Sequence, residues 1–86
     1  MTKSELEAFA REQVALLQPK ALDQGKASGQ RAKGKLQFFE ALVAAYDNTV
    51  TPEQFGQLDA VNDTFQKIGA FESGVTFFND PGSCRK

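Results

Sequence analysis

The chain has 86 residues and a mass of 9.4 kDa, which is enough for a single domain spanning residues 1–86. Its composition, 41% hydrophobic and 24% charged, is that of an ordinary globular domain and excludes intrinsic disorder. It contains no histidine and carries a net charge of −1. These facts exclude histidine-based catalysis and histidine-containing zinc sites, and the net charge favours no class of partner.

The first predicted helix spans residues 5–18. Two overlapping capping boxes, Thr2 to Glu5 and Ser4 to Glu7, mark its start. Pro19 is expected to end it, because the residue before a proline disfavours helical geometry. At about 100° per residue, the apolar side chains fall on one arc of the helix. These are Leu6, Phe9, Ala10, Val14, Leu16 and Leu17.

One polar side chain, Gln13, interrupts the apolar arc of this helix at a position where a leucine would be expected. Two explanations stay open at this stage. The amide is either hydrogen-bonded to backbone within a small core or at its rim, or part of this helix face contacts a partner.

Residues 20–34 are predicted to form a flexible loop or a short, fraying helical turn, because this stretch has three glycines and one large apolar side chain. Residues 20–35 carry five cations against one anion, and residues 36–86 carry three cations against seven anions. The loop is therefore a candidate anion-binding segment, and a solvated linker is the alternative. The candidate anion-binding residues are Lys26, Arg31, Lys33 and Lys35.

The run from Gly29 to Lys35 has the spacing of a phosphate-binding loop. The position after it is Leu36, where such a loop needs a serine or threonine to hold magnesium. The chain is also too short for the sheet that surrounds such a loop, so a nucleotide hydrolase is not expected.

Two further helices are predicted at residues 35–47 and 52–69. Thr51, Pro52 and Gln54 supply a cap, a first-turn proline and a capping-box partner for the last of them, and Gly69 is suited to its C-terminal end. The core-facing residues of the second helix are Leu36, Phe39, Leu42, Val43 and Tyr46, and those of the third are Phe55, Leu58, Val61, Phe65 and Ile68.

Residues 70–86 are predicted to form an irregular apolar C-terminal arm. Val75 to Phe78 has strand-like composition but no strand to pair with. Phe77 and Phe78 are adjacent, so in an extended chain they point to opposite sides, and one bundle surface buries only one of them. The alternative is that the arm completes the core. The candidate partner-binding residues are Phe38, Phe71, Phe77 and Phe78.

Other chemistry is not indicated. Asp59 and Asp63 lie on the outer face of the third helix with Lys67 close by, which favours a solvated ion-pair surface over acid–base catalysis. The segment from Asp47 is too short for a calcium-binding loop. No metal or cofactor is expected. The single cysteine, Cys84, together with the lack of an apolar leader, indicates a cytoplasmic protein, and no apolar run is long enough to span a membrane.

The sequence thus predicts an all-α fold, a small three-helix bundle with an apolar arm. Catalytic residues and metal ligands are missing while phenylalanine is abundant, with eight in the chain. This combination predicts a non-enzymatic protein-binding module, such as an adaptor, inhibitor or assembly subunit, whose partner is another protein, and self-association is a further expectation. The alternative function is binding of nucleic acid or another polyanion through residues 20–35.

Overall fold

Three α-helices make up most of the computed structural model of the chain, which describes residues 1–85. No strand is present in the described residues, so the predicted all-α fold class is confirmed. Lys86, the last residue of the predicted arm, lies outside the described part. The elements are α1 (Lys3–Lys20), α2 (Ala27–Tyr46), α3 (Pro52–Lys67) and a short 3₁₀ helix, η1 (Pro81–Ser83).

Thr2 caps α1 and Thr51 caps α3, as predicted, although α1 begins at Lys3, two residues before the predicted start. The backbone N–H of Glu5 donates to Thr2 Oγ1 at 3.2 Å, and the backbone N–H of Thr2 donates to Glu5 Oε1 at 3.0 Å. Thr51 and Gln54 form the same reciprocal pair at 3.1 and 2.9 Å. These bonds satisfy N–H groups that have no partner within the helix, and the bond from the Thr2 N–H lowers the pKa of the Glu5 carboxyl.

Helix α1 continues past Pro19, so the prediction that this proline ends the helix is wrong. Proline disfavours helical geometry in the preceding residue without forbidding it, and in the last turn it removes only one backbone donor. The N–H of Ala21 then donates to the Leu17 carbonyl at 2.9 Å. The last residue of the helix is therefore Lys20, one residue beyond the proline, and Ala21 caps it.

Helix α2 begins at Ala27, eight residues earlier than predicted. The predicted loop is therefore wrong for residues 27–34, which are helical, and the connection to α1 is confined to residues 21–26. A close approach between the turn and the helix explains the glycine there. A Cβ on Gly29 would lie 1.7 Å from the carbonyl oxygen of Asp23, so this position accepts no side chain. Gly29 packs the turn against α2 instead of breaking the helix.

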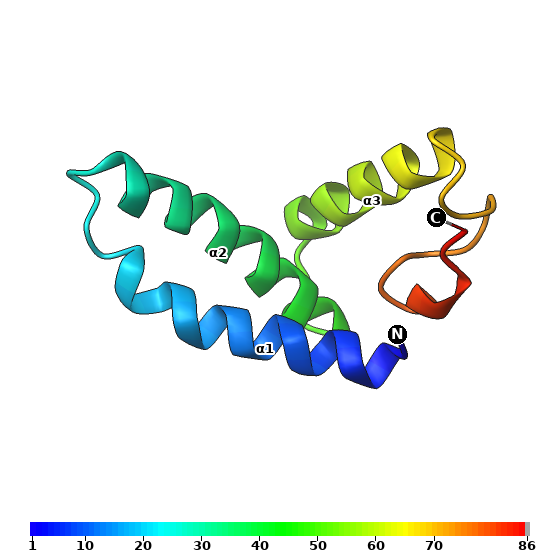
Figure 1. Cartoon of the computed structure of the whole chain (residues 1–86), viewed down its shortest axis with the longest axis horizontal. Coiled ribbons are helices and arrows are strands. Elements are labelled where there is room, and N and C mark those ends of the chain that lie inside the picture. The colour runs from blue at the N-terminus through cyan, green and yellow to red at the C-terminus, as the bar shows by residue number, and fades with distance from the viewer. Residues whose placement is uncertain (86) are drawn as a thin grey trace.

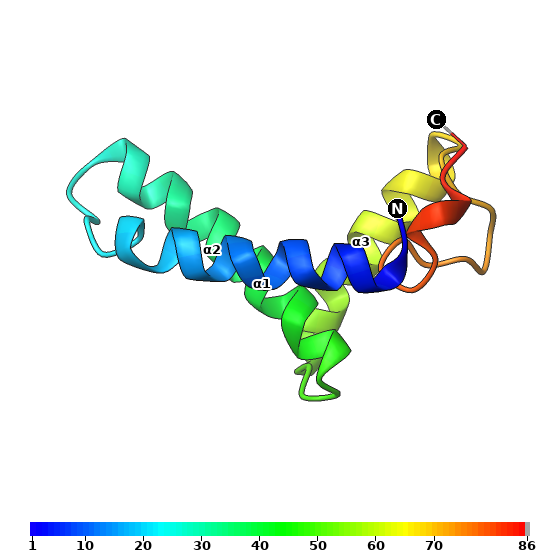
Figure 2. The ribbon, with the colours of Figure 1, turned by 60° about the horizontal axis from the view of Figure 1, so that its bottom comes forward.

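Helices α1 and α2 form an antiparallel hairpin, and α3 leaves the end of α2 at an angle, so that α2 and α3 form a V (Figure 1). Within the described residues, no Cα atom of α1 lies within 8 Å of one in α3. A second view shows the turn of the hairpin extending away from α3 (Figure 2). The radius of gyration is 13.7 Å, compared with about 12 Å expected for a chain of this length. The half of the hairpin near its turn is therefore a two-helix layer.

The core lies where the other half of the hairpin meets α3 and the C-terminal arm, residues 70–85. Phe71, Phe77 and Phe78 of the arm are only 7%, 8% and 9% exposed. The arm thus completes the core, and the prediction that Phe77 and Phe78 cannot both be buried within one chain is wrong. The buried cluster comprises Ala10, Ala41, Leu42, Leu58, Ala70, Phe71, Phe77 and Phe78.

A turn in the arm brings both rings to the same side. The backbone N–H of Asp80 donates to the Thr76 carbonyl at 3.0 Å, so the chain reverses direction around Phe77 and Phe78. Their ring centroids are 5.3 Å apart with the planes at 86°, an edge-to-face contact. Adjacent side chains point to opposite sides only in an extended strand, which this segment is not.

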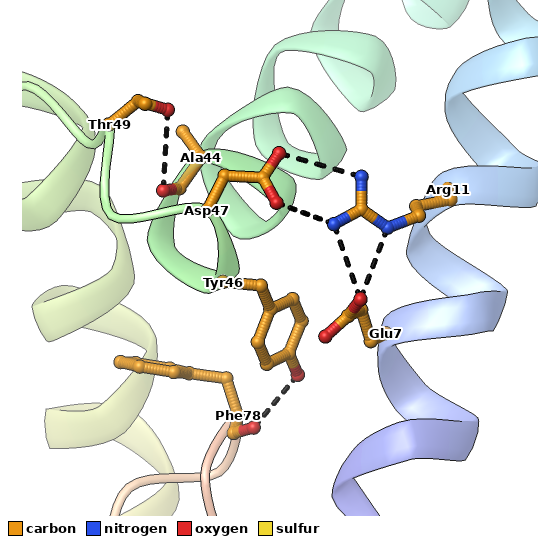
Figure 3. A network of polar contacts seen from close by, with 7 residues as sticks. All are labelled: Glu7, Arg11, Ala44, Tyr46, Asp47, Thr49 and Phe78. Carbon is orange, nitrogen blue, oxygen red and sulfur yellow. Dashed lines mark hydrogen bonds and ion pairs between the residues drawn. The ribbon is translucent and has the colours of Figure 1, made fainter.

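Hydrogen bonds fix the arm against α2 and α3. The backbone N–H of Phe77 donates to Oδ1 of Asn62, a buried polar residue of α3, at 3.0 Å. The hydroxyl of Tyr46, at the end of α2, donates to the carbonyl of Phe78 at 2.8 Å (Figure 3). A buried backbone group without a partner destabilises a fold, so these two side chains determine where the arm can dock.

An ion-pair bridge joins α1 to the end of α2. The Arg11 guanidinium lies 2.6 Å from Asp47 Oδ1 and 3.2 Å from Glu7 Oε2 (Figure 3). All three side chains are substantially exposed, so solvent screens the attraction and the contribution to stability is small.

The close contact at Gly29 generates a matched pair of substitutions in α2. Gly29→Ala should lower the melting temperature, because the added Cβ collides with the Asp23 carbonyl. Gly34→Ala has open space around it and should raise the melting temperature by several degrees, since alanine favours a helix by about 1 kcal/mol over glycine. Thermal melts followed by circular dichroism measure both. Equal shifts in the two variants would contradict the packing of this turn.

Burial of the arm predicts the effect of replacing Phe77 and Phe78 together by serine. Each loss of a buried phenylalanine side chain costs about 3–5 kcal/mol, and the two together approach the whole stability of a small domain. The double variant should lose its cooperative thermal transition and much of its helical circular dichroism. Phe55→Ser, at a site that is 48% exposed, is the control and should keep both. A native-like double variant would show that the arm is not part of the core.

The environment of Tyr46 predicts a loss of stability at high pH. Burial, with a smaller effect of the Glu7 charge, raises the pKa of Tyr46 to about 12, compared with about 10 in an unfolded chain. The neutral phenol is therefore favoured by folding. Its contribution to stability is complete below pH 10 and is lost as the pH rises towards 12. Urea unfolding across this range should show a steeper decline for the wild type than for Tyr46→Phe, and parallel declines would refute the assignment.

Candidate protein-binding surface

An apolar stripe on α1, one of the two helices of the hairpin, is exposed to solvent. Phe9 and Leu16 are 42% and 51% exposed, and half-buried Gln13 lies between them on the same helix face. We call these three residues the Phe9–Leu16 stripe. Phe9 and Leu16 belong to the predicted apolar arc of this helix, but the structure does not bury them. The expectation that Phe55 of α3 and Ile68, which caps the C-terminus of α3, face the core is wrong, because they are 48% and 54% exposed.

The stripe is exposed because, within the described residues, α2 is the only α-helix that packs against α1. Ala10 and Leu17 point at α2 and are buried, whereas the stripe lies about 90° away around the helix. The predicted apolar arc extends beyond the face that α2 covers, and α3 packs on α2 and not on α1. Part of the arc therefore has no partner within the described chain.

The stripe is joined to the core by a chain of aromatic contacts. The ring of Phe9 makes an edge contact with Phe39 at 5.7 Å, and Phe39 makes one with Phe38 at 5.3 Å. Phe38 stacks on Phe77 of the arm at 6.4 Å. Because each ring is held by the next, the exposed edge of Phe9 is presented from a packed support.

Two of the predicted anion-binding residues lie on the same side of the hairpin as the stripe. Arg31 and Lys35 are four residues apart on α2, and Lys35 is one helical turn before Phe38 and Phe39. The contact between Phe9 and Phe39 places this side of α2 next to the stripe. Both cations are exposed and form a basic border for the apolar surface.

The other two predicted anion-binding residues face elsewhere. Lys33 is two positions from both Arg31 and Lys35, which is about 200° around the helix. Lys26 lies at the N-terminal end of α2, and its amino group is 3.7 Å from the Asp23 carboxylate. The structure therefore does not bring the four cations together in one cluster.

The structure buries most of the predicted partner-binding residues and leaves one of them beside the surface. Phe71, Phe77 and Phe78 are buried, and only half-buried Phe38 borders a surface. Sequence reasoning missed Phe9 and Leu16 as surface residues. The signal that marks this face is Gln13, because a polar residue within an apolar arc indicates a position that water or a partner reaches.

A cleft of about 400 Å³ accounts for the exposed ring of Phe55. It lies between the starts of α1 and α3 and the arm, with Tyr46 and Phe78 among its walls. The Lys3 amino group is 6.0 Å from the centre of the Tyr46 ring, at the limit of a cation–π contact. The cleft is therefore aromatic with one cation at its edge.

The described residues contain no cluster of side chains that could hold a metal ion. In residues 1–85 no three acidic, cysteine or histidine side chains gather closely enough to hold a metal ion. Asp59 and Asp63 are exposed on α3, at solvated positions. None of the described helices combines the length and the apolar character needed to cross a membrane.

Comparison with protein-family models, with curated proteins and with solved structures gave no match. The surfaces of this chain are therefore the basis on which a function can be proposed.

Proposed function

We propose that this protein is a non-enzymatic protein-binding module, an adaptor, inhibitor or assembly subunit, that binds its partner through the Phe9–Leu16 stripe. The observation that carries the proposal is the exposure of Phe9 and Leu16 on a face whose rings connect to the core. Exposed apolar side chains that lie close together can mark a binding site, and aromatic anchors dominate the energy of protein interfaces.

The charges around the stripe suggest the character of the partner. Arg31 and Lys35 border it on the α2 side, and Glu12 borders it on α1, four residues before Leu16. An amphipathic helix with acidic side chains on one edge and a basic side chain on the other is complementary to this arrangement. Gln13 supplies a hydrogen-bonding group in the centre, where it fixes register without requiring a charge.

A cytoplasmic location is part of the proposal. Cys84 is exposed and is the single cysteine of the chain, so it cannot form a disulfide within one copy. A small domain in an oxidising compartment is usually stabilised by paired cysteines.

Binding of nucleic acid or another polyanion through residues 20–35 remains a prediction. Lys33 faces away from Arg31 and Lys35, and Lys26 lies at the start of α2 beside Asp23, so the cations do not form a continuous phosphate track. In the proposed function, Arg31 and Lys35 contribute to the choice of protein partner instead.

The test is an affinity purification from the native host with three forms of the chain. A partner of the stripe should be retained by the wild type and reduced about tenfold or more by the double substitution Phe9→Ser and Leu16→Ser, since loss of central apolar anchors costs over 1 kcal/mol each. Ala8→Ser with Ala15→Ser is the matched control, because both positions are exposed on α1 at the same seven-residue spacing.

The retained proteins are identified by mass spectrometry, and circular dichroism checks that all three forms are equally helical. If the stripe variant retains the same proteins as the wild type, or if no protein is retained by any form, the proposed function is wrong.

A further inference from the structure

A second surface lies on the side of the hairpin opposite the Phe9–Leu16 stripe. It is an open groove of about 500 Å³ between the turn of the hairpin and α2, which we call the Leu22 groove. No residue of α3 or of the arm lines it. Its walls combine two leucines, a cation and an anion with three amides; the residues used below are Leu22, Leu36, Lys33, Gln37 and Glu40.

The apolar part of this groove is poorly covered. Leu22 is 83% exposed, the highest value among the large apolar side chains of the described residues, and Leu36 beside it is half-buried. The surface of the whole chain is 5606 Å², whereas a folded monomer of this mass exposes about 5000 Å². The chain thus exposes about 600 Å² more than expected, and the uncovered side chain of Leu22 contributes to this excess.

Two opposite charges of the groove lie at equal distances from a common midpoint along α2. Lys33 and Glu40 are seven residues apart, so they lie on one helix face about 10 Å from each other. Within residues 1–85 neither side chain forms an ion pair. Leu36 and Gln37 occupy the same face between them, and the midpoint of the charged pair falls between these two residues.

We propose that a second copy of this chain occupies the Leu22 groove, with its α2 antiparallel to the first. A two-fold axis between Leu36 and Gln37 places Lys33 of each copy opposite Glu40 of the other. Two ion pairs then form at the ends of the contact, while the Leu36 side chains meet near the axis and Leu22 is covered at the flank. A second copy carries the matching charges in the matching order, and an isologous interface of this kind closes on itself.

The dimer leaves the proposed partner surface accessible. The Phe9–Leu16 stripe lies on the opposite side of the hairpin, so each copy keeps its stripe exposed. The inference therefore goes beyond the proposed function and does not rest on it, and the substitutions Phe9→Ser and Leu16→Ser should not alter dimerisation.

Sedimentation equilibrium over a range of protein concentrations at low salt tests the pairing. The wild type should dimerise, and Lys33→Glu or Glu40→Lys alone should weaken dimerisation about tenfold or more, since each turns two attractions into two repulsions. The double reversal K33E/E40K should restore the wild-type constant to within about threefold. A mixture of the two single variants should form a heterodimer, because both cross-chain contacts are then between opposite charges.

Asp63→Lys, a reversal at an exposed position of α3, is the control and should dimerise as the wild type does. Leu22→Ser should weaken dimerisation in every charge background. Circular dichroism checks that all variants keep the helical fold. A wild type that stays monomeric throughout, or single variants that neither lose dimerisation alone nor pair with each other, would overturn the proposal. A monomer whose groove retains a different protein in a Leu22-dependent manner would overturn it equally.

Discussion

The arrangement of the three helices depends on the contacts that the ring of Phe77 makes. The ring stacks on Phe38 of α2, meets Phe65 of α3 edge-on at 5.5 Å, and lies against Phe78 of its own turn. The neighbouring backbone N–H is bound by Asn62. Because α1 and α3 are not in direct backbone proximity, the arm acts as the missing layer that lets a hairpin and a single further helix share one core.

The sequence predicted those parts of the fold that are determined locally. The capping boxes at Thr2 and Thr51 act within four residues, and both helices begin as these signals indicate. The start of α2 depends on a contact between Gly29 and the turn, which helix propensity does not describe. A glycine that lowers helix propensity in isolation can be required when another backbone segment approaches it closely.

The candidate surface was harder to predict, for a related reason. Apolar periodicity identifies the face that avoids water, but not how many neighbouring elements cover it. Phe9 and Phe39 both lie on predicted core faces, and only the path of α3 decides that Phe9 remains at the edge. In the arm, alternation predicted opposite directions for Phe77 and Phe78, and the turn closed by Asp80 overrides it. Such a turn depends on packing, and the composition of four residues does not reveal that packing.

The position of Tyr46 has a consequence for how the folding of this protein can be observed. The chain has no tryptophan and one tyrosine, so its intrinsic fluorescence arises from the phenol whose hydroxyl binds the arm. Far-ultraviolet circular dichroism, in contrast, averages over all three helices. The two signals thus separate docking of the arm from formation of the helices, without any attached dye. Coincident transitions would show that the arm and the helices form one cooperative unit, and an earlier change in fluorescence would mark a helical intermediate with a detached arm.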